Sequence, residues 1–102
     1  MTDDQLLQIL KNHLDITWTA DDLLDQKLQG MIKRGKTYLS RLASGNELDF
    51  KEDSKETELL LEYCLYVYAK SLDSFVTDYL PELQSFQLEQ EVIAYDKANS
   101  DV

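Results

Sequence analysis

The stretch from Leu61 to Tyr79 constrains the fold of this chain more than any other, because its apolar residues recur with a helical period. A helix that is apolar over most of its circumference normally lies at the centre of a domain. The sequence therefore predicts a central third helix here, with Leu65, Leu72 and Phe75 buried in the assembled state. The main stripe consists of Leu61, Leu65, Tyr68, Leu72, Phe75 or Val76, and Tyr79, and it is widened by Leu60, Tyr63, Cys64 and Val67.

Turn-forming residues are scarce, because the 102 residues include only three glycines and one proline. An all-β fold would need many more turns. The hydrophobic fraction of 43% is enough for a core, and the length is typical of one domain. We therefore predict an all-α fold: a small bundle of about four helices over residues 1–95, followed by an extended polar tail over residues 96–102.

Two short polar motifs mark expected helix starts. Thr2 and Gln5 have the spacing of a capping box, in which each side chain bonds the backbone N–H of the other residue. A short first helix should run from there to about His13. Asp53 or Ser54 should cap the third helix in the same way.

The second helix has an expected start and an expected end. Thr19 is a suitable N-cap, and Trp18 just before it has the position of a hydrophobic staple that fixes the entry angle of the chain. The pair Gly45-Asn46 should stop the helix. Gly30 and Gly35 are unfavourable inside a helix, and close approach of another helix would explain why they are tolerated.

Further apolar residues should complete the core. We expect Leu48 and Phe50 to plug it from a loop, and Pro81 to open a fourth helix at its first position. Periodicity does not decide whether residues 91–95 continue that helix or form an extended segment. The residues of the fourth helix expected to face inward are Leu83, Phe86 and Gln90.

Catalytic chemistry has little support in the sequence. His13, the single histidine, should lie near a helix end, and Cys64 should be a small core residue. Two carboxylate clusters fall at helix starts, where the helix dipole favours them. No P-loop, G-x-G-x-x-G, C-x-x-C or H-E-x-x-H motif occurs. We therefore predict a protein that is not an enzyme and has no catalytic, cofactor-binding or metal-binding residues.

The composition also bears on location. No run of about 18 apolar residues exists, and Met-Thr-Asp-Asp lacks the features of a secretory signal. One cysteine allows no internal disulfide, as expected in a reducing compartment. These features predict a small, soluble, intracellular protein.

Charge is divided unevenly along the chain. Residues 1–43 hold six acids and six bases, whereas residues 44–102 hold fourteen acids and four bases, which accounts for the net charge of −10. The bases of the first half are concentrated in a stretch without acids, residues 27–41. A nucleic-acid-binding protein would usually carry the opposite overall sign.

The basic stretch has three possible interpretations: a solvated helix end, a surface that pairs with acids of another subunit, or a phosphate-binding site. Net −10 disfavours the third. As a hypothesis, we assign the second to Lys33, Arg34, Lys36 and Arg41, with acids of region 47–62 on a neighbouring subunit as partners. Tyrosine is enriched at interfaces, and we expect Tyr66 and Tyr95 to serve there.

Several segments together resemble the head–tail connector (adaptor) proteins of tailed bacteriophages. The resemblance covers about residues 6–96 and rests on apolar positions and two helix-starting loops, without a catalytic signature. Its segments are Asp15-Ile-Thr-Trp18, acids at 21–22, Lys27-Leu-x-Gly30-Met-Ile-x-Arg-Gly35-Lys-x-Tyr-Leu39, Leu48-Asp-Phe50, Glu58 to Val67, and Glu91-Val-Ile-Ala-Tyr-Asp96.

This resemblance implies a structural virion protein, assembled in the bacterial host cytoplasm. It would form a ring, typically of twelve subunits, that docks on the portal, extends the DNA channel and offers a surface to the stopper or tail. DNA would pass through an acidic lumen without specific binding. The alternative is a small acidic phage or prophage regulator that binds a host protein, for instance by mimicking DNA charge.

Overall fold

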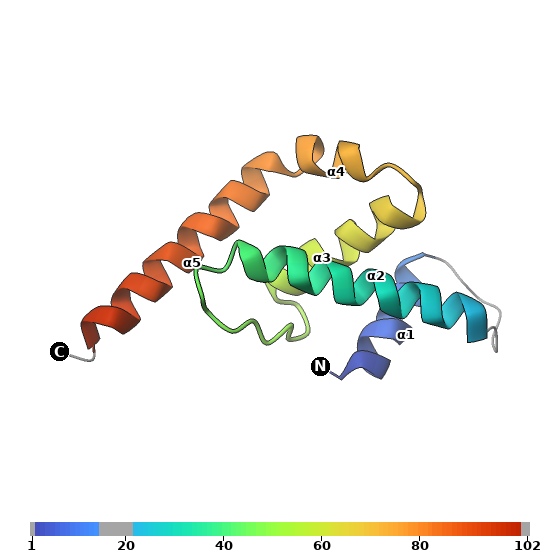
Figure 1. Cartoon of the computed structure of the whole chain (residues 1–102), viewed down its shortest axis with the longest axis horizontal. Helices are drawn as coiled ribbons and strands as arrows, with labels where there is room; N and C mark the ends of the chain where they lie inside the picture. The colour runs from blue at the N-terminus through green and yellow to red at the C-terminus, as the bar shows by residue number, and fades with distance from the viewer. Residues whose placement is uncertain (1, 15–21, 101–102) are drawn as a thin grey trace.

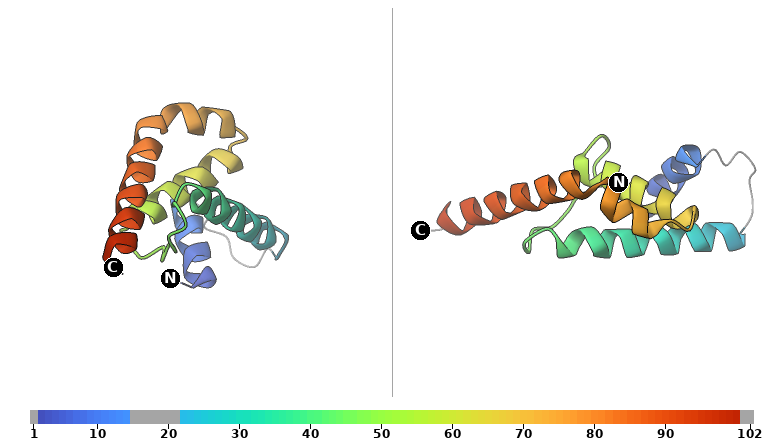
Figure 2. Two further views of the ribbon diagram at one scale, coloured as in Figure 1. Left: turned by 60° about the vertical axis from the view of Figure 1, so that its left-hand side comes forward. Right: turned by 90° about the horizontal axis from the view of Figure 1, so that it is seen from above.

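The computed structural model describes residues 2–14 and 22–100, and these residues form five helices and no strand. The all-α prediction is thereby confirmed. The helices are α1 (Asp3–His13), α2 (Asp22–Arg41), α3 (Lys55–Tyr68), α4 (Leu72–Asp78) and α5 (Leu80–Ser100). The molecule measures 53 × 29 × 19 Å along its principal axes, and α5 extends beyond the other helices at one end (Figures 1 and 2). The expected cap Thr19 and staple Trp18 lie outside the described residues.

The first and third helices start where the polar motifs predict. The Thr2 hydroxyl accepts a hydrogen bond from the Gln5 N–H at 3.2 Å, and Gln5 Oε1 accepts one from the Thr2 N–H at 2.9 Å. This is the predicted capping box. Ser54 caps α3, since its hydroxyl accepts a hydrogen bond from the Thr57 N–H at 3.3 Å. Each cap satisfies an N–H group that would otherwise lack a partner.

The core lies between α1, α2 and α3, with contributions from the loop before α3 and from α4 and α5. Phe50 is buried and Leu48 packs against the core, as predicted for this loop. Inside the bundle α2 passes close to α3 at Gly35, whereas Gly30 has open space around it. The close-approach prediction therefore holds for Gly35 and fails for Gly30. The completely buried large side chains are Phe75, Phe86, Leu6, Leu10, Leu28, Leu39, Leu60 and Cys64.

The predicted single helix across residues 61–79 is wrong. α3 ends at Tyr68, and α4 begins at Leu72 after a turn in which Lys70 adopts a left-handed φ of 56°. The Lys70 N–H bonds the Val67 carbonyl at 3.0 Å, and the Ser71 N–H bonds the Tyr66 carbonyl at 2.8 Å. These two bonds are those of a Schellman motif, which satisfies the last carbonyls of a helix.

The turn changes which apolar residues are buried. Phe75 is completely buried, and its ring lies within 5.2–6.2 Å of the rings of Tyr38, Tyr63, Tyr66 and Tyr79, centroid to centroid. Leu72 is 40% exposed and Leu65 is half-buried, so of the three residues predicted to be buried in the assembled state only Phe75 is buried within the single chain. After the turn at Lys70, α4 buries Phe75 in the bundle, whereas Leu72, the first residue of this helix, stays partly exposed.

The fourth predicted helix corresponds to α5, with Pro81 in its first turn. Leu83, Phe86 and Gln90 are buried, as predicted. Residues 91–95, which the sequence left as either helix or extended segment, are helical. The predicted extended tail from residue 96 is wrong, because the helix continues to Ser100. No glycine or proline lies between Gln90 and Ser100, so nothing in this segment breaks the helix.

A candidate interaction surface on α2 and α5

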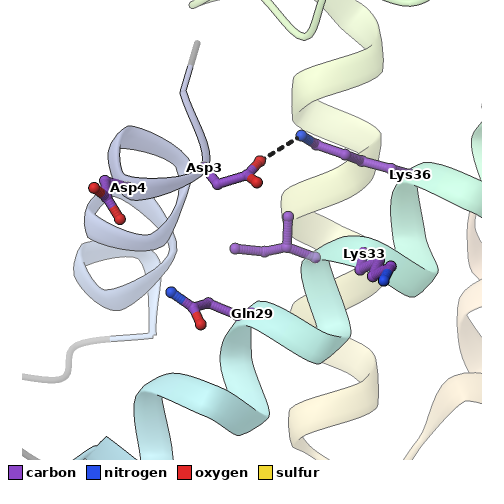
Figure 3. Close-up of a pocket in the computed structure, with 6 residues that line it drawn as sticks. Asp3, Asp4, Gln29, Lys33 and Lys36 are labelled. Atoms are coloured by element: carbon purple, nitrogen blue, oxygen red, sulfur yellow. Dashed lines mark hydrogen bonds and ion pairs between the residues drawn. The ribbon is translucent and has the colours of Figure 1, made fainter.

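Lys36 connects α2 to α1 within the chain. Its ammonium group lies 2.9 Å from the Asp3 carboxylate and 5.4 Å from the centroid of the Phe50 ring. Figure 3 shows the Lys36 side chain extending from α2 to the start of α1. The hydrogen bond and the charge of Lys36 lower the pKa of Asp3 from its ordinary value. Lys36, which we expected at a subunit interface, therefore already has an acidic partner.

The pair lies in a groove between α1 and α2 that measures about 510 Å³ (Figure 3). Its lining includes the two acids at the start of α1 and two lysines of α2, so opposite charges face each other across it. This arrangement explains the groove as part of the packing between the two helices. The lining residues are Asp3, Asp4, Gln29, Ile32, Lys33 and Lys36.

A second groove lies between α2 and α3, and we call it the basic groove. It measures about 410 Å³ and is lined by Lys33, Arg34, Thr37, Tyr38, Arg41 and Tyr63. The three cationic residues are exposed, and none of them forms an ion pair with another described residue. Three of the four basic residues predicted for an interface are thus brought together here.

Two tyrosines give the basic groove an apolar component. The rings of Tyr38 and Tyr63 are stacked, with centroids 5.5 Å apart and an interplanar angle of 29°. Burial raises the pKa of Tyr63, and the nearby charge of Arg34 opposes that shift. The Tyr63 hydroxyl therefore stays neutral near pH 7. Tyr63 is buried, so the partly exposed ring of Tyr38 is the aromatic surface that the basic groove offers beside its exposed cations. This combination suits an apolar partner flanked by carboxylates.

The outward side of α5 carries an apolar stripe, formed by Leu88, Val92 and Tyr95. Their side chains are 62%, 53% and 69% exposed, respectively. The spacings of four and three residues place them on one face of the helix. The same helical period places this face opposite the one that Leu83, Phe86 and Gln90 bury. Tyr95, predicted for an interface, therefore belongs to a larger exposed apolar surface.

Acidic residues border this stripe. Glu91 and Asp96 lie on its two edges by helical spacing, and both are exposed. The stripe is therefore apolar in the middle and acidic at its edges, which is complementary to the aromatic and cationic side chains of the basic groove. The i, i+4, i+7 pattern of Leu88, Val92 and Tyr95 is visible in the sequence, but the sequence prediction of an interface includes only Tyr95 of the three. Nothing in the sequence predicts the groove itself, because its two rings come from separate helices.

Tyr66 is partly buried and serves an internal contact. Its hydroxyl donates a hydrogen bond to Asp78 Oδ2 at 2.8 Å, which raises the pKa of Tyr66. Its ring packs against Phe75 and Tyr79. The side chain therefore fixes α4 on α3, and most of its surface is used within the chain.

The single histidine contacts an acid of α3, and the single cysteine is buried in the core. His13 Nε2 lies 3.2 Å from Glu62 Oε1, which connects the end of α1 to α3. Cys64 is completely buried, and burial raises the pKa of its thiol to about 12. Within residues 2–14 and 22–100, no group of three or more histidine, cysteine or acidic residues is placed to hold a metal ion. None of the helices described is both long and apolar enough to cross a bilayer.

Comparison of the chain with protein-family models, curated proteins and solved structures gives no significant match.

Proposed function

We propose that this chain is the subunit of a head–tail connector ring of a tailed bacteriophage. In this function the ring docks on the portal, extends the DNA channel and presents a surface to the stopper or tail. The proposal combines the sequence resemblance with one structural observation that points to assembly. That observation is the outer face of α5, where three large apolar side chains are exposed on a helix that projects from the bundle.

An exposed apolar stripe of this kind favours association. Single exposed apolar residues are common on monomeric proteins, but contiguous ones with a polar border are typical of interaction sites. The separation of a basic groove on α2 from acidic edges on α5 also favours contact between unlike surfaces. Unlike surfaces on one subunit generate a ring when the rotation between neighbours closes.

The experiment is electron microscopy and mass photometry of the purified full-length chain, alone and after co-expression with the portal protein of the same genome. We expect ring particles with a central channel, and a portal complex in which the chain forms a second tier. A monomer or dimer under both conditions would contradict the connector function. That result would favour the acidic regulator instead, and a pull-down with host proteins would then test it.

A further inference from the structure

The outer face of the C-terminal part of α5 is exposed at all three stripe residues, Leu88, Val92 and Tyr95. Gln90 fixes the middle of this helix on the bundle, since its backbone carbonyl and side-chain oxygen accept hydrogen bonds from Asn46 Nδ2 at 2.8 and 2.9 Å. Beyond it the helix continues for ten residues, or about 15 Å. Figures 1 and 2 show this segment projecting past the rest of the molecule.

The buried face of α5 determines which way the stripe faces. Leu83 and Phe86 are buried against the bundle, and the helical period places the stripe on the opposite side of the helix. Lys55 of α3 reaches Ser85 Oγ at 3.1 Å and Glu89 Oε1 at 3.4 Å between these two faces. The stripe therefore faces away from the bundle, and the basic groove of the same chain is not its partner.

We propose that the apolar stripe of α5 docks into the basic groove of a second copy of this chain. The stripe side chains Leu88, Val92 and Tyr95 would pack against the partly exposed ring of Tyr38 of the second copy. Glu91 and Asp96 would lie near Lys33, Arg34 and Arg41. This contact rests on the proposed function, because it requires that the chain assembles with itself. It adds the two surfaces that would meet between neighbouring subunits.

Charge favours a second copy over another occupant of the groove. A chain of net charge −10 repels nucleic acid as a whole, although three unpaired cations lie side by side on α2. One contact between copies would cover the apolar stripe and give those cations carboxylate partners. The groove volume of about 410 Å³ is in the range of pockets that take several side chains or a small ligand.

The contact joins two different surfaces, so each copy still offers one free stripe and one free groove. Such a heterologous contact propagates from subunit to subunit and closes into a ring when the geometry permits. A contact between two α5 stripes would be symmetric and would stop at a dimer. The two arrangements predict different cross-links, which makes them distinguishable.

The test uses two single-cysteine-addition variants of the full-length chain, Thr37→Cys in the groove and Val92→Cys on the stripe. Both positions are exposed, whereas the native Cys64 is buried with a thiol pKa of about 12 and should not react. We expect mild oxidation of an equimolar mixture to give a disulfide-linked heterodimer of the two variants. Gln87→Cys, which lies on α5 away from the stripe, replaces Val92→Cys in the control mixture and should give none.

Further variants test the chemistry of the contact. Val92→Lys and Arg34→Glu change exposed side chains, so both should fold normally and weaken self-association about tenfold or more, as measured by sedimentation. A Val92→Cys homodimer as the main product would overturn the proposal, as would the absence of any cross-link at high protein concentration. Binding of a duplex DNA fragment that Arg34→Glu abolishes, without the heterodimer, would also overturn it.

The cross-link and the ring are separate readouts. Rings in the microscope without the Thr37→Cys to Val92→Cys product would overturn this contact and leave the connector function intact. The cross-link without rings, as in an open chain of subunits, would support the contact and contradict the connector function.

Discussion

Gly35 of α2 lies so close to Leu60 of α3 that a Cβ atom at Gly35 would come within 2.5 Å of Leu60 Cδ1. It would also lie 2.9 Å from Tyr63 Cδ1. The absence of a side chain at this position therefore sets the distance between the two helices at the centre of the core. A Cβ atom at Gly30, about one and a half turns earlier, would have no neighbouring atom within 4 Å.

These two glycines give a matched pair of substitutions. Gly35→Ala should destabilise the protein by about 1–3 kcal/mol, because the new methyl group displaces Leu60 or Tyr63. Gly30→Ala should stabilise it by about 0.5–1 kcal/mol, since alanine favours the helix and has room. Urea unfolding of both variants measures the difference, and equal effects would show that the close approach at Gly35 is not as described.

Lys70 provides a second test of backbone conformation. It occupies the position after the α3 cap with a φ of 56°, which L-amino acids other than asparagine and aspartate rarely adopt. Lys70→Gly should therefore stabilise the protein by about 0.5–1 kcal/mol, because glycine adopts this conformation without strain. Lys70→Ala is the control for the lost side chain and should not stabilise. Thermal melts that show no gain for Lys70→Gly would argue for a continuous helix here.

The break at Lys70 also explains why the predicted long helix was wrong. Apolar spacing continues across the turn, and the usual glycine signal of a helix end is replaced by lysine. The two capping motifs and the inward face of α5 were predictable, because they depend on residues a few positions apart. The extended tail was wrong because polar composition alone does not end a helix. The groove between Tyr38 and Tyr63 depends on packing between helices, which local patterns do not encode.

Leu72 and Phe75 test the revised arrangement of α4. Phe75→Ala should cost about 3–5 kcal/mol, since it removes a completely buried ring from among four tyrosines. Leu72→Ala should cost less than about 1 kcal/mol, because the side chain is already 40% exposed. Denaturant unfolding measures the free energy of unfolding of both variants. A similar large loss of stability for both would contradict the break at Lys70 and support one continuous buried helix over residues 61–79.

The pair between Asp3 and Lys36 should affect stability in acid. Lys36 lowers the pKa of Asp3 below its ordinary value of 3.8 in the folded protein. A carboxyl of this kind adds stability at higher pH and loses that contribution as the pH falls through the folded pKa. Asp3→Asn should therefore be less stable than the wild type at pH 7 and converge with it as the pH falls through the lowered pKa of Asp3.

The size of this effect should be small, because the Asp3 side chain is 79% exposed. Asp4→Asn is the matched control, since Asp4 lies in the same first turn of α1 but does not pair with Lys36. Melting temperatures across the acid range, at low and high salt, measure both variants. Identical pH profiles for Asp3→Asn and Asp4→Asn would show that the pair contributes nothing.

Charge reversals at Lys36 and Arg34 should separate folding from assembly. Lys36→Glu would place a second carboxylate beside Asp3 and remove the cation from the Phe50 ring, so the monomer should lose about 1 kcal/mol. Arg34→Glu changes an exposed side chain without an ion pair among the described residues. Its effect on the free energy of unfolding should stay within about 0.5 kcal/mol, while assembly weakens.

Chemical denaturation gives the stability of each variant, and mass photometry at several salt concentrations gives its assembly. Wild-type assembly should weaken as salt rises, because exposed charge pairs are screened over about 10 Å at 0.1 M salt. Arg34→Glu should show weak assembly already at low salt, with normal folding. If it instead assembles like the wild type at low salt, the cations of the basic groove are a solvated helix face. Association would then depend on the apolar stripe of α5 alone.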